Sequence, residues 1–405
     1  MKNKGWEIFK NSLNYLGGGS STNSKIPNFE EEPAILIKGK GCRVYDFEGN
    51  EYIDFRCALG PVTLGYNLPE INSAIIKQLE NGVVFSYPHV LESEVAKKIT
   101  EIIPCAERVR FLKTGGEAIA ACIKIARNYT KRKKIIHCGY NGWLNCFDTG
   151  GISAPGILSS SPLKGIPPEI SALHINLQWA DFEKWERVFK EQGEEIAGVV
   201  IASDYKDIEK GKEFLPFIRD LTKKYGSLMI IDEIVTGFRV AIGGIQEYFN
   251  FLPDMAVFSK GIANGMPLSI YCGRKELIDS AKEIGISSTF GGETLSLAAS
   301  NAVVEFYKKN NVIKYLWEIG QKMWSGVNNL FKQYEVEAEL KGFPVCPFFD
   351  FKNPEERNLF FRKCFKNRVI LYNVGYVCYS HKEKDINEAL EKVEKSIKEM
   401  KNGSN

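Results

Sequence analysis

An acid and an amine follow two apolar runs that have the composition of buried strands. The run 228–231 ends at Asp232 and Glu233, and the run 255–258 is followed closely by Lys260. Runs of this kind are typical of parallel strands whose carboxyl ends meet at one edge of a sheet. An amine held there can form a Schiff base with a carbonyl, and a nearby carboxylate can keep a pyridinium nitrogen protonated. The pair indicates the chemistry that pyridoxal 5'-phosphate requires. Taken alone, however, Lys260 reads more simply as a solvated lysine at a strand end.

A candidate anion site precedes this pair in the chain. Residues 108–112 read as a strand, Thr114, Gly115 and Gly116 follow it, and residues 118–129 have helical character. Small residues let backbone N–H groups approach a phosphate, and the helix dipole places about half a positive charge at the helix N-terminus. A Gly-Gly pair before a helix is weak evidence by itself. Its position ahead of the lysine motif makes a phosphate site the better interpretation.

The order of residues between 228 and 267 resembles the signature of the class III aminotransferases. The matching pieces are Asp-Glu-Ile-Val-Thr-Gly-Phe-Arg at 232–239, Pro-Asp at 253–254, Ser-Lys-Gly at 259–261 and Gly-Met-Pro at 265–267. Val-Ala-Ile-Gly-Gly at 240–244 most resembles the glutamate-1-semialdehyde 2,1-aminomutase branch of that family. The resemblance covers nearly the whole chain and is strongest from residue 108 to residue 300.

This resemblance implies a fold type I architecture, an obligate homodimer with shared active sites, and pyridoxal 5'-phosphate as cofactor. Lys260 would hold the cofactor as an internal aldimine and then act as base and acid, while Asp232 would keep the ring nitrogen protonated. The other implied cofactor contacts are Tyr140 and Ile234 on the two ring faces, and Thr114, Gly115, Gly116 and, from the other subunit, Thr289 on the phosphate. On the residues alone, Tyr140 also fits a packed aromatic side chain at a strand end.

The substrate side departs from the family pattern at two positions. The glycine run 17–19 reads as a flexible linker, but the corresponding family segment lies close to the substrate. Aligned from that run, Lys25 stands where the aminomutases carry an arginine that binds a substrate carboxylate, and lysine lacks the planar fork of arginine. Leu59 replaces an aromatic residue that lines the substrate pocket. Both changes predict a different substrate pocket.

Three further departures concern the cofactor side. Asn141 replaces the histidine of the Gly-x-Tyr-His-Gly segment, and we interpret this change as tuning. Ala202-Ser203 stands in place of Glu-Pro, and Glu293-Thr294 in place of Asn-Pro.

Composition excludes several classes of protein. The 405 residues are 44% hydrophobic and 25% charged, with a net charge of +3, which favours no nucleic-acid or membrane partner. The chain has no apolar stretch of about 18 residues and no signal peptide core, so a cytoplasmic location is expected. Its ten cysteines lack a Cys-x-x-Cys pair and are expected to be reduced, and its four histidines have no metal-binding spacing.

The elements that must position these residues alternate between strand and helix. This alternation predicts an α/β fold with a mostly parallel sheet sandwiched by helices, plus a smaller α+β domain. We expect an N-terminal segment and antiparallel meander over 1–66, a large cofactor-binding domain over 67–310, and a C-terminal α+β domain over 311–405. Residues 149–170, rich in Gly, Ser and Pro, are expected to form a surface loop.

These observations favour an aminotransferase that moves an amino group between an amino donor and a separate aldehyde or ketone. The rival hypothesis is a glutamate-1-semialdehyde 2,1-aminomutase, which transfers the amino group within one molecule. Lys25 and Leu59 weigh against the rival. A third hypothesis, a protein that kept the fold and lost the chemistry, conflicts with the presence of Asp232, Lys260 and the glycine turn at Gly115.

Overall fold

The computed structural model describes residues 3–142, 152–154, 157–158 and 165–402 of the chain. These residues form two compact units, which we call the large unit (residues 69–313) and the small unit (residues 1–68 with 314–405). None of the helices in the described part of the chain has both the length and the apolar character needed to cross a membrane.

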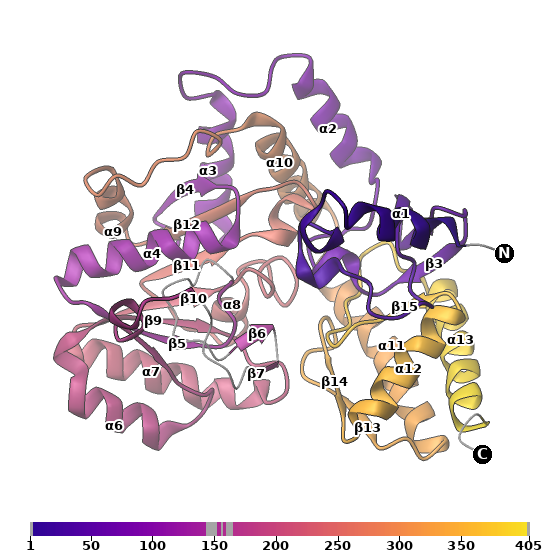
Figure 1. Cartoon of the computed structure of the whole chain (residues 1–405). Coiled ribbons are helices and arrows are strands. Elements are labelled where there is room, and N and C mark those ends of the chain that lie inside the picture. The colour runs from indigo at the N-terminus through magenta and orange to yellow at the C-terminus, as the bar shows by residue number, and fades with distance from the viewer. Residues whose placement is uncertain (1–2, 143–151, 155–156, 159–164, 403–405) are drawn as a thin grey trace. The chain divides into compact units, whose positions relative to one another are not determined.

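The large unit is built on a seven-stranded sheet with the order β4-β12-β11-β10-β9-β5-β8 (Figure 1). The strand bounds are Arg108–Leu112 for β4, Ser269–Gly273 for β12, Met255–Phe258 for β11, Leu228–Asp232 for β10, Ile196–Ala202 for β9, Lys134–Cys138 for β5 and His174–Asn176 for β8. Strand β12 runs antiparallel to both of its neighbours, and the other pairs are parallel. The prediction of a mostly parallel sheet is therefore confirmed.

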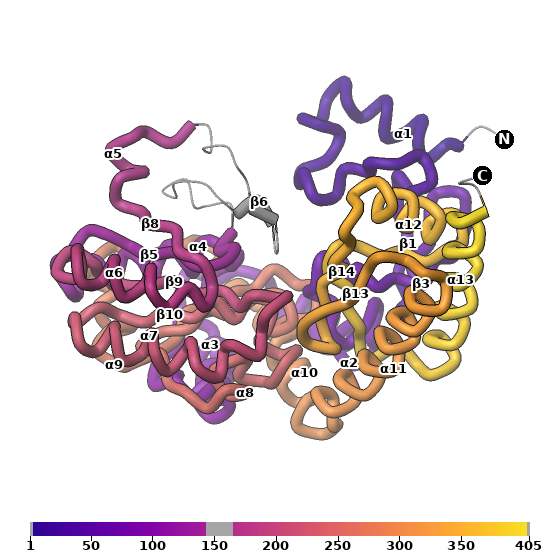
Figure 2. Tube along the Cα trace, turned by 90° about the horizontal axis from the view of Figure 1, so that it is seen from below, coloured from indigo at the N-terminus to yellow at the C-terminus, as the bar shows by residue number. Residues whose placement is uncertain are grey.

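Helices cover this sheet and account for its apolar strands. Helix α4 (Gly115–Thr130) packs across the sheet, and its side chains share one buried cluster with Val200, Ile230 and Val257. Every residue of β10 is buried, which explains its unbroken apolar composition. Helices α6 (Phe182–Gln192) and α7 (Gly211–Tyr225) pack together, and Figure 2 shows β5, β9 and β10 side by side in the same unit. The other helices of this unit are α2 (Pro69–Leu79), α3 (Val90–Ile102), α5 (Pro168–Ser171), α8 (Ile245–Tyr248), α9 (Lys275–Asp279) and α10 (Thr294–Lys309).

The small unit joins the two ends of the chain through one sheet. Strands β1 (Leu36–Lys40), β2 (Arg43–Asp46) and β3 (Glu51–Asp54) form the expected antiparallel meander, and β15 (Val369–Ile370) adds to β3 in parallel. Because of this pairing, the expected segments 1–66 and 311–405 fall in one unit, apart from residues 311–313, which belong to the large unit. Its other elements are α1 (Lys4–Ser12), α11 (Val312–Gln333), β13 (Ala338–Lys341), β14 (Phe348–Phe351), α12 (Pro354–Lys366) and α13 (Glu383–Asn402).

Local expectations from periodicity were wrong in two places. The apolar spacing suggests that the first helix reaches Leu16, but α1 ends at Ser12, and Leu13 and Leu16 are exposed. Residues 377–379 look like a strand but are irregular. Their amides bond outside a ladder, because Cys378 N donates to His381 Nδ1 and Tyr379 N donates to Thr63 O.

The expected surface loop at 149–170 lies largely outside the described residues. Within it, β6 (Ile152–Ala154) and β7 (Ile157–Leu158) pair antiparallel.

Candidate active site

Asp232 and Lys260 lie at the same edge of the central sheet. Asp232 ends β10 and is paired with Val257 of the parallel neighbour β11. Lys260 follows just beyond β11 and opens a short 3-10 helix, Lys260–Ala263. Its backbone has a positive φ of 47°, which is uncommon for a residue with a side chain and is often found at functional sites. The carboxyl edge of a parallel sheet thus carries both the acid and the amine.

The interior position of this pair shifts both ionisation equilibria toward neutral pH. Burial raises the pKa of Asp232 to about 6, although the Ile234 amide, the Asn141 side chain and the charge of Lys260 act in the opposite direction. Burial lowers the pKa of Lys260 to about 8, and the charge of Asp232 opposes this shift while that of Arg239 adds to it. The Lys260 residue as a whole is partly exposed, and a pKa of about 8 brings its amine close to deprotonation near neutral pH.

The turn between β4 and α4 has the geometry of an anion site. The Thr114 side chain caps α4 by accepting from Glu117 N, and the Glu117 carboxylate accepts from Thr114 N at 2.7 Å and Lys113 N at 3.1 Å. Gly115 and Gly116 occupy the first turn, where amide groups have no partner within the helix. Ile234 fills the space beside Gly115, so a side chain at this position would require Ile234 to shift. Two amides at a helix N-terminus are therefore available to an anion next to the end of β10.

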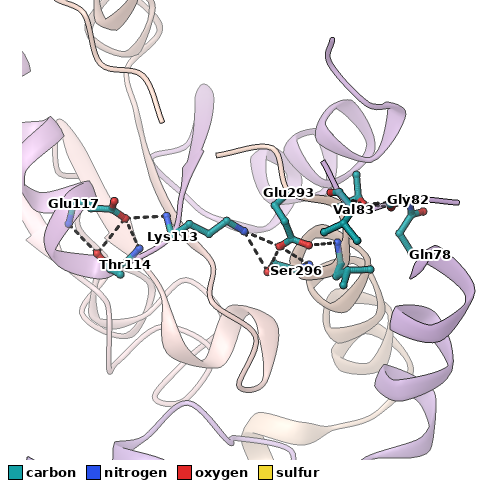
Figure 3. A network of polar contacts seen from close by, with 10 residues as sticks. Gln78, Gly82, Val83, Lys113, Thr114, Glu117, Glu293 and Ser296 are labelled. Carbon is teal, nitrogen blue, oxygen red and sulfur yellow. Dashed lines mark hydrogen bonds and ion pairs between the residues drawn. The ribbon is translucent and has the colours of Figure 1, made fainter. Parts of the chain in front are cut away.

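A buried polar network fixes this turn to the start of α10 (Figure 3). Lys113 Nζ lies 2.8 Å from Glu293 Oε2 and 3.3 Å from Ser296 Oγ, and Glu293 caps α10 by accepting from the amides of Leu295 and Ser296. Thr294 Oγ1 donates to the carbonyl groups of Gly82 and Val83, and it accepts from Gln78. The strand end, the α10 N-terminus and the connection after α2 are thus held as one piece.

Two residues have roles that the sequence analysis missed. Asn141 Nδ2 donates to Asp232 Oδ2 at 3.3 Å, so the residue that replaces the family histidine contacts the site acid directly. Glu233 holds the following loop, since its carboxylate accepts from Ile245 N at 2.8 Å, Gln246 N at 3.0 Å and the Thr236 hydroxyl. Burial raises the pKa of Glu233 to about 7. Of the two adjacent carboxylates, Asp232 belongs to the site and Glu233 supports the backbone.

The remaining candidates of the large unit are Tyr140, Ile234 and Thr289, and they differ in burial and position. Tyr140 is partly buried and follows β5, which β9 separates from β10. Ile234 is partly buried against the cluster under α4. Thr289 is exposed on a turn before α10. Tyr140 and Ile234 therefore lie near strand ends of the sheet, and Thr289 faces solvent in the single chain.

The two substrate candidates, Lys25 and Leu59, line one pocket of the small unit. This pocket has a volume of about 580 Å³ and is also lined by Arg56, Glu32 and Asp54. The Arg56 guanidinium donates to Ser24 O and lies 4.4 Å from the Tyr372 ring centre, while its Nε is buried with no hydrogen-bond partner in the described ranges. Sequence analysis missed Arg56 because nothing in its position along the chain marks it as a pocket residue.

The residues of the large-unit site fit pyridoxal 5'-phosphate. They supply an amine of lowered pKa for an aldehyde, a buried carboxylate for a ring nitrogen, and amides at a helix N-terminus for a phosphate. No group of three or more His, Cys, Asp and Glu side chains in the described ranges is arranged to hold a metal ion.

Comparisons with known proteins agree with this geometry. The model of the family described as aminotransferase class III matches residues 27–397. The chain is 32% identical to glutamate-1-semialdehyde 2,1-aminomutase of Sulfurihydrogenibium azorense, covering 98% of this chain and 99% of the relative. It is 30% identical to 3-aminobutyryl-CoA aminotransferase of Cloacimonas acidaminovorans, covering 97% and 96%.

A solved structure shows the same fold. The FumI protein of Sphingopyxis sp. MTA144, in a form that carries PLP, superimposes with a TM-score of 0.90 at 22% identity, covering 99% of this chain and 97% of that one. The predicted fold class is confirmed. With a family match over most of its length and full-length relatives at this level of identity, the chain belongs to the class III aminotransferases, enzymes that use pyridoxal phosphate.

Proposed function

We propose that this enzyme moves an amino group from an amino donor to a separate aldehyde or ketone, with Lys260 as its catalytic amine. The observation that carries the assignment of Lys260 as the catalytic amine is the meeting of Lys260 and Asp232 at the ends of neighbouring strands. Lys260 would hold the cofactor and Asp232 would face its ring nitrogen. Tyr140 and Ile234 would flank the ring. The phosphate would be bound by Thr114, Gly115, Gly116 and Thr289 of the partner subunit.

Each protein group has a defined task in this reaction. The bound cofactor supplies a ring that accepts electrons from the substrate carbon. Lys260 Nζ takes the proton from that carbon and returns it at the other end of the reacting system, and a pKa of about 8 suits an amine that must do both near neutral pH. Asp232 stabilises a positively charged ring nitrogen and so strengthens the electron-accepting character of the ring.

The small-unit pocket supports a substrate with an acidic group. Its two carboxylates are already satisfied, because Glu32 accepts from the amides of Asn28 and Phe29, and Asp54 accepts from Tyr66 Oη at 2.6 Å. The cations Lys25 and Arg56 line the same pocket. A carboxylate on the amino donor or acceptor would pair with these cations.

Transfer between two molecules is favoured over the intramolecular reaction by the same pocket. At the position of the aminomutase arginine, Lys25 lacks the planar fork of that residue, and Leu59 leaves more space than an aromatic side chain. The full-length relatives include an aminomutase and an aminotransferase at similar identity, so these pocket residues carry the choice.

We also propose a cytoplasmic homodimer. Phe85 and Tyr87 of the connection between α2 and α3 are exposed, as is Val90 at the start of α3, and Phe290 is exposed next to Thr289 in the sequence. Large apolar side chains that remain exposed in a single chain are often covered by another subunit. This arrangement supports the contribution of Thr289 to the site of a second copy.

The decisive experiment compares two reactions of the purified holoenzyme. Conversion of the bound cofactor by common amino donors, followed in single turnover by absorbance, should be efficient. Turnover of glutamate-1-semialdehyde should be slow. Efficient formation of 5-aminolevulinate would overturn the choice of aminotransferase, and full activity of a Lys260→Ala variant would overturn the assignment of the amine.

A further inference from the structure

We propose that Arg127, His174, His137 and Asn141 form a hydrogen-bond chain with one fixed direction, which orients Asp232 and holds it as a carboxylate. These four are positioning residues, because they act on the cofactor only through Asp232. The inference rests on the proposed role of Asp232 and adds the device that sets its charge and orientation.

The chain is continuous from the surface of α4 to the end of β10. Arg127 Nη2 lies 3.2 Å from His174 Nε2, and His174 Nδ1 lies 2.8 Å from His137 Nε2. His137 Nδ1 lies 3.2 Å from Asn141 Oδ1, and Asn141 Nδ2 lies 3.3 Å from Asp232 Oδ2. Four contacts thus connect a guanidinium to the site acid.

The direction of the chain follows from Arg127, which donates hydrogen bonds and never accepts them. His174 Nε2 must therefore accept, so the proton of a neutral His174 lies on Nδ1 and is donated to His137. His137 then accepts at Nε2 and carries its proton on Nδ1, which donates to the Asn141 carbonyl. The Asn141 amide group is left to face Asp232 as a donor. Both rings are consequently neutral Nδ1–H tautomers.

The surroundings of the two rings support this assignment. His137, His174 and Asn141 are 2%, 4% and 1% exposed, so a bulk solvent molecule does not substitute for a missing partner. The rings stack with centroids 5.0 Å apart, and two positive charges at that distance repel each other. Burial lowers the pKa of His174 to about 3, with His137 and Arg127 adding to the effect, so His174 is neutral at physiological pH.

The chain also gives Asn141 a defined role at the position where the family carries a histidine. The Ile234 amide donates to Asp232 Oδ1 at 3.0 Å, and Asn141 supplies the donor for the other oxygen. With one donor on each oxygen, the carboxylate has a single orientation, and its charged form is favoured against the cost of burial. The pair His137–His174, one step farther from Asp232, orients the Asn141 amide.

The test is ¹⁵N NMR of the histidine ring nitrogens in the full-length apoprotein at pH 7. The signals of each ring are assigned from variants in which one histidine at a time is replaced. His137 and His174 should both show neutral Nδ1–H tautomers. A ring found as Nε2–H or as imidazolium overturns the proposal. Arg127→Met should shift His174 toward a mixture of tautomers, and Arg108→Met, which removes an exposed arginine of the same unit, should leave it unchanged.

A second measurement follows Asp232 itself. The pKa of its carboxyl group, measured by ¹³C NMR in apoprotein, should be higher in Asn141→Leu than in the parent, and an unchanged pKa contradicts the proposal. Both measurements are made without cofactor or substrate. A negative result in either measurement would contradict the hydrogen-bond chain but not the proposed aminotransferase activity. That activity is tested separately, by the assays of the holoenzyme and of the Lys260→Ala variant.

Discussion

Ile234 occupies the space that any side chain at Gly115 would need. A Cβ atom at Gly115 would lie 2.3 Å from Ile234 Cδ1 and 2.9 Å from its Cγ1. This contact sets how closely the α4 N-terminus approaches the end of β10, and so links the anion site to the residue that follows Asp232.

Gly115→Ala is expected to weaken cofactor binding about tenfold or more, because overpacking costs roughly 1–3 kcal/mol and here displaces the amides of the α4 N-terminus. Equilibrium dialysis with pyridoxal phosphate, carried out on the variant and on the parent protein, measures the loss of cofactor affinity. Adding Ile234→Val removes the nearest methyl group and should restore part of the affinity. Equal affinity of Gly115→Ala and the parent would show that the turn is not a phosphate site.

The amine of Lys260 should titrate well below ordinary lysines. Its pKa is lowered to about 8, chiefly by burial, so its uncharged form predominates above that pH. In apoprotein, arylation of Lys260 by fluorodinitrobenzene should therefore accelerate with rising pH and level off above about pH 8, as mapped by mass spectrometry.

Asp232→Asn is the matched comparison for this titration. The Asp232 charge stabilises the ammonium form of Lys260, so its removal should move the arylation midpoint to lower pH. A midpoint that stays in place, or that lies near the value of an exposed lysine, would contradict the assigned electrostatic coupling. In the holoenzyme, the same variant should lose roughly 10²–10⁴-fold in turnover.

Much of the central sheet could be predicted from the sequence, because its strands are short and apolar and are followed by polar residues. The run 228–231 and the run 255–258 predicted two strand ends with an acid and an amine, and the structure has these strands as parallel neighbours. The turn at Gly115 was equally visible, since a strand, two small residues and a helix follow one another directly.

The contacts that the sequence did not reveal all depend on distant pairing. Asn141 reaches Asp232 because β9 alone separates β5 from β10, and this order is a property of the assembled sheet. The split of tasks between Asp232 and Glu233 depends on which way each side chain leaves the strand end. The pairing of β15 with β3 brings residues 369–370 to residues 53–54, and no local pattern predicts such a contact.

The ion pair of Lys113 and Glu293 should stabilise the large unit in a pH-dependent way. Both side chains are largely buried, and Glu293→Gln is expected to cost about 1–3 kcal/mol by leaving the Lys113 charge without its partner. Thermal unfolding measured by circular dichroism at pH 7 should give a lower Tm for Glu293→Gln than for the parent protein. In the double variant with Lys113→Met, the loss should be smaller than the sum of the two single losses.

The sign of the pH dependence follows from the Glu293 pKa. Burial raises this pKa, but hydrogen bonds from Lys113 and Ser296 outweigh it and bring the pKa below the ordinary 4.5. The stabilisation is therefore present above pH 4.5 and is lost as the pH falls through the lower folded-state value. A Tm difference between parent and Glu293→Gln that persists unchanged in strong acid would refute the pairing.

Arg56 should discriminate between charged and neutral amino donors. If its guanidinium pairs with a substrate carboxylate in the small-unit pocket, Arg56→Met should raise KM for β-alanine roughly 10–100-fold, the loss expected for a hydrogen-bonded charge. The KM for isopropylamine, which lacks a carboxylate, should change little. Arg368→Met is a suitable control, because Arg368 also lies over a tyrosine ring, Tyr52 at 4.9 Å, but does not line the pocket. Equal effects of Arg56→Met on both donors would assign Arg56 to the packing of Tyr372 and remove it from substrate recognition.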